Sequence, residues 1–261
     1  PKHRLVKRTK TKKNYFTHLA SVESLKSHQW VHSAPLEETE KDLKQKLSLL
    51  DKFYIATKYL GYLIKTSKTT SLTISSKDED KIDYYKELLT KLDIPYSVHS
   101  KPEKTMIKVD DINIYDLDEN RIKTLPKYDL TTLSKEWCSS YLEEVLYWSG
   151  YERNASIKFS SSKLTDLEWL QELSVLLGHK TRLFEEASDT NTNRRYRLVV
   201  INSHDHTEQV AVETKELDGA DVYGISVPTG FLVTRKDGVT CVTGNSVHGT
   251  YIGYKFQLAF N

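Results

Sequence analysis

The pattern of apolar and polar positions changes twice along the chain. The first twenty residues, PKHRLVKRTKTKKNYFTHLA, are basic and lack helical periodicity, which indicates strands and connecting loops. From Glu37, the segment EETEKDLKQKLSLLDKFYIATKYLGYLI has apolar residues spaced near every third or fourth position, which predicts a helix. Beyond Ser188 the chain is polar and then favours strands, with runs such as RLVVINS, QVAVETKEL and GFLVTRKDGVTCVTG. We therefore expect strands, a mixed α/β region, and strands again.

The middle region contains an internal duplication. After the first helix come an alternating strand, SLTISS, and an amphipathic helix, KDEDKIDYYKELLTKLDI. The same order returns as WCSSYLEEVLYWSG, ASIKFSSS and SKLTDLEWLQELSVLLGH. At an offset of 85 residues apolar positions coincide, namely Ile74 with Phe159, Ile82 with Leu167, and Leu88 with Leu173. Two copies are too few for a solenoid and predict a pseudo-twofold domain.

Composition narrows the classes of protein only slightly. A hydrophobic content of 38% and a charged content of 28% are ordinary for a globular chain. The net charge of +2 neither demands nor excludes a polyanionic partner. We expect no membrane partner, because no apolar stretch is long enough to span a bilayer. Cys138 and Cys241 are too few for a disulfide framework or a four-cysteine zinc site, which predicts a reducing cytoplasm.

A long motif stands near the C-terminus. The segment VYGISVPTGFLVTRKDGVTCVTGNS, from Val222 to Ser246, resembles the last two blocks of inteins, especially those of bacteriophage-type genes. In that family such a strand leads through a basic hairpin to V-T-G-N, followed by Ser, Thr or Cys. At the other end, PKHRLVKR resembles the intein block built on Thr-x-x-His, with His3 as the histidine. A lone Gly-Asn-Ser is usually a turn, but the extended match favours a splice junction between Asn245 and Ser246.

The resemblance implies single-turnover, autocatalytic protein splicing. Ser246 would accept the upstream protein segment as an ester by transesterification. Asn245 would then form a succinimide and break its bond to Ser246, after which an acyl shift restores an amide. This is intramolecular nucleophilic catalysis, in which fixed geometry replaces a second reactant. His3 would act as acid or base on the upstream scissile peptide, and we expect no cofactor.

Two positions depart from the family pattern. Many inteins carry His before the final Asn, where this chain has Gly244, and Asp after the Val-Tyr pair, where it has Gly224. Another group must then assist Asn245. The candidates, near in sequence only, are Asp221, His204 and His206.

The resemblance also implies a missing upstream part. An intein begins with Cys, Ser or Ala ahead of the Thr-x-x-His strand, and this sequence starts at Pro1. We therefore expect the C-terminal part of a split intein, which splices in trans with a separate N-terminal intein fragment and its N-extein. Residues 246–261 would be C-extein or a tag. The expected location is the cytoplasm of the host cell of a phage or microbe.

The duplicated region resembles the LAGLIDADG homing endonucleases, through YLGYLIKTS (Tyr59 to Ser67) and LEEVLYWSG (Leu142 to Gly150). The family packs these two helices side by side, and each ends in an acidic residue that holds divalent metal over DNA. Those positions map onto Thr66 and Ser149. Because a hydroxyl does not replace a carboxylate as a hard-cation ligand, we expect the fold without metal and without nuclease activity. The strands TTSLTISSK and ASIKFSSSK suit a DNA groove, or equally any solvent-facing sheet.

The fold class that follows is a β-rich Hint (hedgehog/intein) splicing domain, from residues 1–40 and 206–245. It is interrupted at 41–205 by an α/β LAGLIDADG-like pseudo-twofold domain. Two alternatives remain. One is a DNA-binding or DNA-cleaving homing endonuclease or maturase-like protein with a vestigial splice junction. The other is an inert globular remnant, against which the intact Asn245–Ser246 pair argues.

Overall fold

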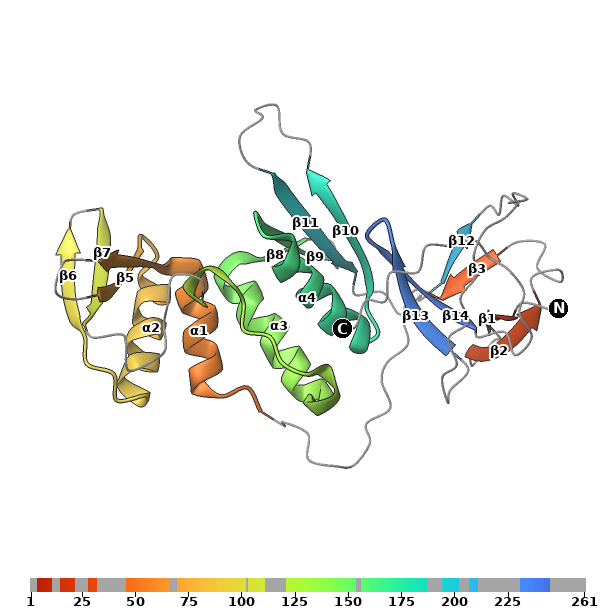
Figure 1. Cartoon of the computed structure of the whole chain (residues 1–261), viewed down its shortest axis with the longest axis horizontal. Helices are drawn as coiled ribbons and strands as arrows, with labels where there is room; N and C mark the ends of the chain where they lie inside the picture. Colours follow the sequence, from red (N-terminus) through yellow and green to blue (C-terminus); the bar gives the residue numbers. More distant parts are fainter. Residues whose placement is uncertain are drawn as a thin grey trace. The chain divides into compact units, whose positions relative to one another are not determined.

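The structure is a computed structural model, and it describes most of the chain in separate stretches (Figure 1). The described residues are 4–10, 15–21, 28–31, 46–65, 70–101, 103–110, 121–153, 156–186, 194–201, 207–210 and 231–244. They form two compact units. The first comprises Glu38–Tyr151 and Phe159–Trp169, and the second comprises Pro1–Glu37, Glu152–Lys158 and Leu170–Asn261. The domain limits expected from the sequence at residues 40, 205 and 245 stay a prediction.

The first α/β repeat lies within one unit. Its elements are α1 (Leu49–Leu60), β4 (Gly61–Lys65), β5 (Thr70–Ser76), α2 (Glu79–Lys91), β6 (Ser97–Lys101) and β7 (Lys104–Val109). The strands form an antiparallel sheet in the order β4-β5-β7-β6, and both helices pack on it (Figure 1). The buried apolar side chains between helices and sheet include Phe53, Ile55, Leu72, Ile74, Ile82, Tyr85, Leu88, Leu89, Ile107 and Val109.

Local chemistry sets the limits of α1. Ser48 caps its start, where the Ser48 side chain accepts from the Asp51 backbone N–H and the Asp51 side chain accepts from that of Ser48. The prediction that this helix runs on to Ile64 is wrong, because α1 ends at Leu60 and β4 follows at once. A Cβ on Gly61 would lie 2.6 Å from the Thr57 carbonyl oxygen, so glycine permits this sharp exit.

The second repeat follows two short 3-10 turns, Arg121–Lys123 and Leu130–Thr132. It comprises α3 (Lys135–Ser149), β8 (Tyr151–Arg153), β9 (Ser156–Ser161), α4 (Leu164–Leu176), β10 (Lys180–Glu186) and β11 (Arg195–Ile201). Its strand order, β8-β9-β11-β10, matches β4-β5-β7-β6 of the first repeat. Helices α2 and α4 have the same 13-residue length and keep the offset seen in the sequence. The predicted duplication and its α/β character are confirmed.

The strands expected at both ends of the chain are confirmed as strands. They are β1 (Arg4–Lys10), β2 (Tyr15–Ser21), β3 (His28–Val31), β12 (Thr207–Val210), β13 (Phe231–Lys236) and β14 (Val239–Gly244). One sheet runs β2-β1-β14-β10-β11-β9-β8, with β13 paired to β14, while β3 and β12 pair separately. The strand that precedes the expected junction therefore shares a sheet with the second repeat. The Hint arrangement itself stays a prediction.

The duplication predicts matched costs of truncating equivalent core leucines. Leu88 and Leu173 are 1% and 0% exposed. We expect Leu88→Ala and Leu173→Ala each to lower the free energy of unfolding by about 2–5 kcal/mol, the usual range for a buried leucine. Urea denaturation followed by circular dichroism measures this, with the exposed Thr90→Ala as control. A small loss at one site only would contradict equivalent packing in the two repeats.

Candidate functional site

The residues expected to carry splicing chemistry, His3, Asn245 and Ser246, lie outside the described residues. So do the proposed helpers Asp221, His204 and His206, and Gly224. The structure does describe the strands that lead to them, because β1 begins at Arg4 and β14 ends at Gly244. These strands pair in antiparallel fashion with Leu5 opposite Thr243. The backbone segments next to the expected histidine and asparagine are thus neighbours in one sheet.

The helices that carry the endonuclease-like motifs, α1 and α3, pack against each other (Figure 1). Helix α3 ends at Ser149 and is capped by Gly150. Helix α1 ends at Leu60 and is capped by Gly61, so the position equivalent to Ser149 is Leu60. Thr66, to which the sequence aligned the acidic position of the first motif, follows β4 and lies outside the described residues, so that assignment stays a prediction. Neither of the two helix-end residues carries a carboxylate.

The polar groups nearest these helix ends form one small set. The Ser149 hydroxyl donates to the Val145 carbonyl oxygen at 3.4 Å, and burial raises the pKa of the Tyr59 phenol above its ordinary value. The nearby carboxylate is Asp166 of α4, which is 1% exposed. Lys58 Nζ lies 3.0 Å from Asp166 Oδ2, and the Leu125 backbone N–H donates to Oδ1 at 3.1 Å. The Asp166 carboxylate is therefore already engaged by a lysine and a backbone N–H of the same unit.

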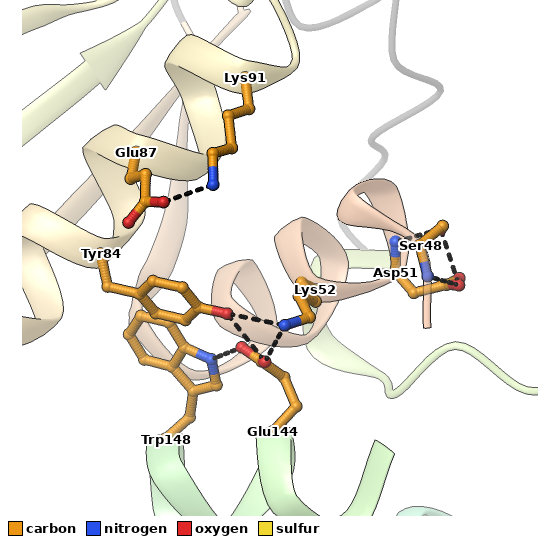
Figure 2. A network of polar contacts seen from close by, with 8 residues as sticks. All are labelled: Ser48, Asp51, Lys52, Tyr84, Glu87, Lys91, Glu144 and Trp148. Carbon is orange, nitrogen blue, oxygen red and sulfur yellow. Dashed lines mark hydrogen bonds and ion pairs between the residues drawn. The ribbon is translucent and has the colours of Figure 1, made fainter. Parts of the chain in front are cut away.

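A second polar cluster joins α1, α2 and α3 around Glu144 (Figure 2). Glu144 is 7% exposed. Its Oε1 accepts from Trp148 Nε1 at 2.7 Å, and its Oε2 accepts from the Tyr84 hydroxyl at 2.9 Å. Lys52 Nζ lies 3.5 Å from the same Oε2 and 3.3 Å from the Tyr84 oxygen. The carboxylate thus has a partner on each of the three helices, its own included.

Aromatic rings enclose this carboxylate. The Tyr84 ring stacks on Trp148 at 5.6 Å between centroids, and Tyr147 meets Trp148 edge-on at 5.0 Å. Lys81 Nζ donates to the Trp148 carbonyl oxygen at 3.2 Å. Burial, followed by the negative charge of Glu144, raises the pKa of Tyr84, so the phenol keeps its proton and donates it to the carboxylate. The cluster is a closed, satisfied network, which points to a role in holding helices together.

Sequence reasoning missed this cluster. A signal was present, because Glu144 and Trp148 are four residues apart on a helix and therefore share a face. An acidic residue on the apolar face of a helix requires partners. The segment was interpreted only as an endonuclease motif.

The four-stranded sheet of the first repeat has one face turned away from the helices, here named the outer sheet face. Strand alternation and register place on it Tyr62, Ile64, Ser71, Thr73, Ser75, Ser97, His99, Lys101, Lys104, Met106 and Lys108. These strand positions include three lysines and no Asp or Glu. Asp110, just past β7, pairs with Lys108 at 2.7 Å. Thr73 is 2% exposed, and its hydroxyl has no hydrogen-bond partner among the described residues.

Two features are absent from the described part of the chain. No group of three or more His, Cys, Asp or Glu side chains there could hold a metal ion. No helix there has the length and apolar character needed to cross a membrane.

Comparison with known proteins gives limited likenesses. No protein-family profile matches the chain. A stretch of 122 residues is 27% identical to the ribonucleoside-diphosphate reductase subunit beta of Aquifex aeolicus (strain VF5). The match covers 44% of this chain and 18% of that protein, so the chain spans less than a fifth of its relative's length.

Similar solved structures include homing endonucleases. A structure of mesophilic variants of the homing endonuclease I-DmoI has a TM-score of 0.43 at 11% identity, covering 59% of this chain and 90% of that one. I-DmoI in complex with DNA and Mn has a TM-score of 0.42 at 12% identity, covering 59% and 90%. The N-terminal LAGLIDADG domain of DUF199/WhiA has a TM-score of 0.37 at 10% identity, covering 66% and 89%. All these TM-scores lie below 0.5, so the likeness alone does not establish a shared fold.

The Glu144 cluster predicts a loss of stability that depends on whether the side chain at position 144 can accept hydrogen bonds. Glu144→Leu leaves the Tyr84 hydroxyl and the Trp148 indole N–H without their acceptor, and we expect a loss of about 1–3 kcal/mol in the free energy of unfolding. Glu144→Gln keeps an amide oxygen that can accept, so its loss should be smaller. Urea titration of both variants measures the difference. Equal losses would mean that the hydrogen bonds contribute little.

Proposed function

We propose that the α/β part of this chain is a DNA-binding domain of the LAGLIDADG type that lacks metal-dependent cleavage. The observation that carries the proposal is the duplicated α/β topology, in which paired helices α1 and α3 each end at a glycine and lead directly into a sheet. The motif resemblance in the sequence supports the same assignment. A DNA-binding protein of this kind, rather than a nuclease, is the function that the described geometry supports best.

The outer sheet face supplies the chemistry for a phosphate backbone. Lys101 and Lys104 face each other across the β6–β7 pair, and both are exposed. His99 and Ser97 on β6 add exposed hydrogen-bonding groups. Lysine and hydroxyl contacts to phosphate give affinity without base selectivity, so the expected ligand is duplex DNA bound with weak sequence preference.

The helix ends argue against cleavage. Two-metal hydrolysis needs hard-cation ligands beside the scissile phosphates, and carboxylates provide them. Leu60 has no polar side-chain group, and the Ser149 hydroxyl donates to the Val145 carbonyl oxygen. Asp166 is held by Lys58 and a backbone N–H. The proposal is therefore binding without strand breakage.

The lysines of the outer sheet face should set both affinity and salt dependence. We expect the triple variant Lys101→Gln, Lys104→Gln, Lys108→Gln to bind duplex DNA more weakly. Its plot of log K against log salt should be less steep by about 0.9 for each phosphate that the variant no longer neutralises. Fluorescence anisotropy of a labelled random duplex across a salt series measures this. Added Mg²⁺ or Mn²⁺ should leave the duplex intact.

A charge-matched control separates this surface from general basicity. Lys46→Gln, Lys86→Gln and Lys91→Gln remove the same charge from α2 and from the segment before α1. This control should keep the wild-type slope. Equal weakening in both triple variants, or no binding by the wild-type chain, would contradict the proposal.

We propose as a second candidate function that the chain is the C-terminal part of a split intein. The observation that favours it is the pairing of β1 with β14, in which Leu5 lies opposite Thr243. The sequence motif assigns the acid–base role to His3, one residue before β1, and the cyclising role to Asn245, one residue after β14. On this proposal the terminal strands, residues 1–40 and 206–245, form the splicing domain.

The proposed reaction proceeds through the chain's own side chains. The Ser246 hydroxyl first takes the upstream acyl group as an ester, displacing the first nucleophile of the N-terminal fragment, which recovers its proton. Asn245 Nδ2 then attacks its own carbonyl carbon, and the bond from that carbon to the Ser246 nitrogen breaks. The freed amine receives the acyl group by an O-to-N shift. The first nucleophile comes from a separate N-terminal fragment, and the segment from Ser246 onward is the C-extein.

Intact-mass spectrometry tests the junction directly. With a synthetic N-terminal intein fragment at pH 7–8, we expect a ligated product and loss of the segment that starts at Ser246. Asn245→Ala should stop the release and leave a branched ester, because no succinimide can form. An unchanged mass despite binding of the fragment would mean that the junction is vestigial, and the DNA-binding function would then stand alone.

A further inference from the structure

Gln171 on α4 is a buried amide with every polar atom engaged. It is 1% exposed. Its Nε2 donates to the Gly238 carbonyl oxygen at 2.8 Å and to Thr181 Oγ1 at 3.1 Å. Its Oε1 accepts from Arg235 Nη1 at 3.3 Å. One side chain of the second repeat therefore binds both the β13–β14 hairpin and β10.

The hairpin turn that Gln171 contacts requires a close backbone approach. Asp237 and Gly238 have φ of 50° and 75°, which is the pattern of a two-residue type I′ turn. The Leu183 backbone N–H donates to the Gly238 carbonyl oxygen at 2.9 Å. A Cβ on Gly238 would lie 1.7 Å from the Leu183 carbonyl oxygen. Only glycine lets the turn lie this close to β10.

The contact between β10 and the hairpin continues from the turn into β14. Arg182 of β10 stands opposite Val239 of β14. Beside this pair, the buried hydroxyls of Thr181 and Thr240 lie 3.3 Å apart. The Gly238 carbonyl oxygen thus receives two donors, one from the Leu183 backbone and one from Gln171. Removing either donor would leave a buried acceptor partly unsatisfied.

We infer that Gln171 is a positioning residue for the splice junction, and this inference rests on the second proposed function. Strand β14 starts beside the Gly238 turn and ends at Gly244, next to the expected Asn245. A paired strand is stiff along its length, at about 3.3 Å per residue, so its origin fixes where its end lies. Helix α4 therefore holds the turn from which β14 runs toward the expected junction. On this proposal the second α/β repeat supports the splice junction through Gln171.

Two variants of Gln171 test this. Gln171→Leu removes all three hydrogen bonds. Gln171→Glu keeps the acceptor for Arg235 but loses the donors to Gly238 and Thr181. We expect amide hydrogen exchange of residues 239–243 to become about tenfold faster in Gln171→Leu, the factor that about 1.4 kcal/mol produces. Exchange in α1, α2 and β7 should not change, which controls for global folding. Thr165→Ala, an exposed change on the same helix, is the matched control.

The second readout is the reaction of each variant with a synthetic N-terminal fragment at saturating concentration. We expect the first-order rate of release at Asn245–Ser246 to fall at least as much as β14 protection, with the fragment's Kd unchanged. Gln171→Glu should recover part of the rate, since it keeps the Arg235 hydrogen bond. If Gln171 only stabilised the fold, its loss would change the amide protection of β14 without lowering the release rate at constant Kd for the fragment.

Each outcome decides a different claim. Unchanged exchange in residues 239–243 of Gln171→Leu overturns the positioning role whatever the junction does. Faster exchange with an unchanged release rate also overturns it, because the hairpin would then be held without serving the junction. A wild-type chain that releases nothing overturns the splicing proposal and this role with it, while the exchange comparison still decides whether Gln171 holds the hairpin.

Discussion

The packing of α1 against α3 is the constraint on which the first unit depends. Each helix contributes fully buried side chains, with Phe53 and Ile55 on α1 and Tyr141 and Val145 on α3. The close pairing requires both helices to stop abruptly, because the chain must leave toward its own sheet. Gly61 and Gly150 permit these exits in extended conformation. The two repeats are thus built outward from one helix pair, and polar groups at its edges must be satisfied within the fold.

Those polar groups show how the repeats have diverged. Lys81 on α2 and Asp166 on α4 occupy equivalent positions at the 85-residue offset, yet they carry opposite charges. Lys81 donates to the Trp148 carbonyl on α3, whereas Asp166 pairs with Lys58 on α1. Each second helix is therefore tied to the first helix of the other repeat. The topology has been kept while the electrostatic partners were replaced, so the duplication is clearer in strand order than in charge.

The sequence was informative where burial imposes a period. The apolar stripe of Ile82, Tyr85, Leu88, Leu89 and Leu92 predicted α2. The structure buries the first four side chains, while Leu92 caps the end of the helix and is only half-buried. The period failed at α1, because Tyr62 to Ile64 continue a helical spacing but pair with β5 instead. Strands β6, β7 and β10 were not anticipated, since their exposed and charged positions hide the alternation. The hairpin ending at Gly244 was recognised from its turn residues and motif.

The interactions of the candidate sites were beyond sequence reasoning for a different reason. The Glu144 cluster and the Gln171 hydrogen bonds join residues far apart along the chain, as Tyr84 to Glu144 and Gln171 to Gly238 illustrate. A single sequence holds no signal for such pairings beyond an isolated polar residue on an apolar face. The sequence motif took the first helix to reach Thr66, whereas α1 ends six residues earlier, at Leu60. The helix ends are set by glycine geometry, which the motif alone did not locate.

The pairing of β1 with β14 also has a consequence for how the chain folds during synthesis. Leu5 and Thr243 come from nearly opposite ends of the sequence, so this pairing has a very high sequence separation and forms late. The two α/β repeats consist of more local interactions and can fold while the ribosome is still making the final hairpin. Strand β1 can pair early with its sequence neighbour β2, but its pairing with β14 must wait until β14 has been synthesised. Any site built where β1 and β14 pair would therefore be assembled only after both strands have been synthesised.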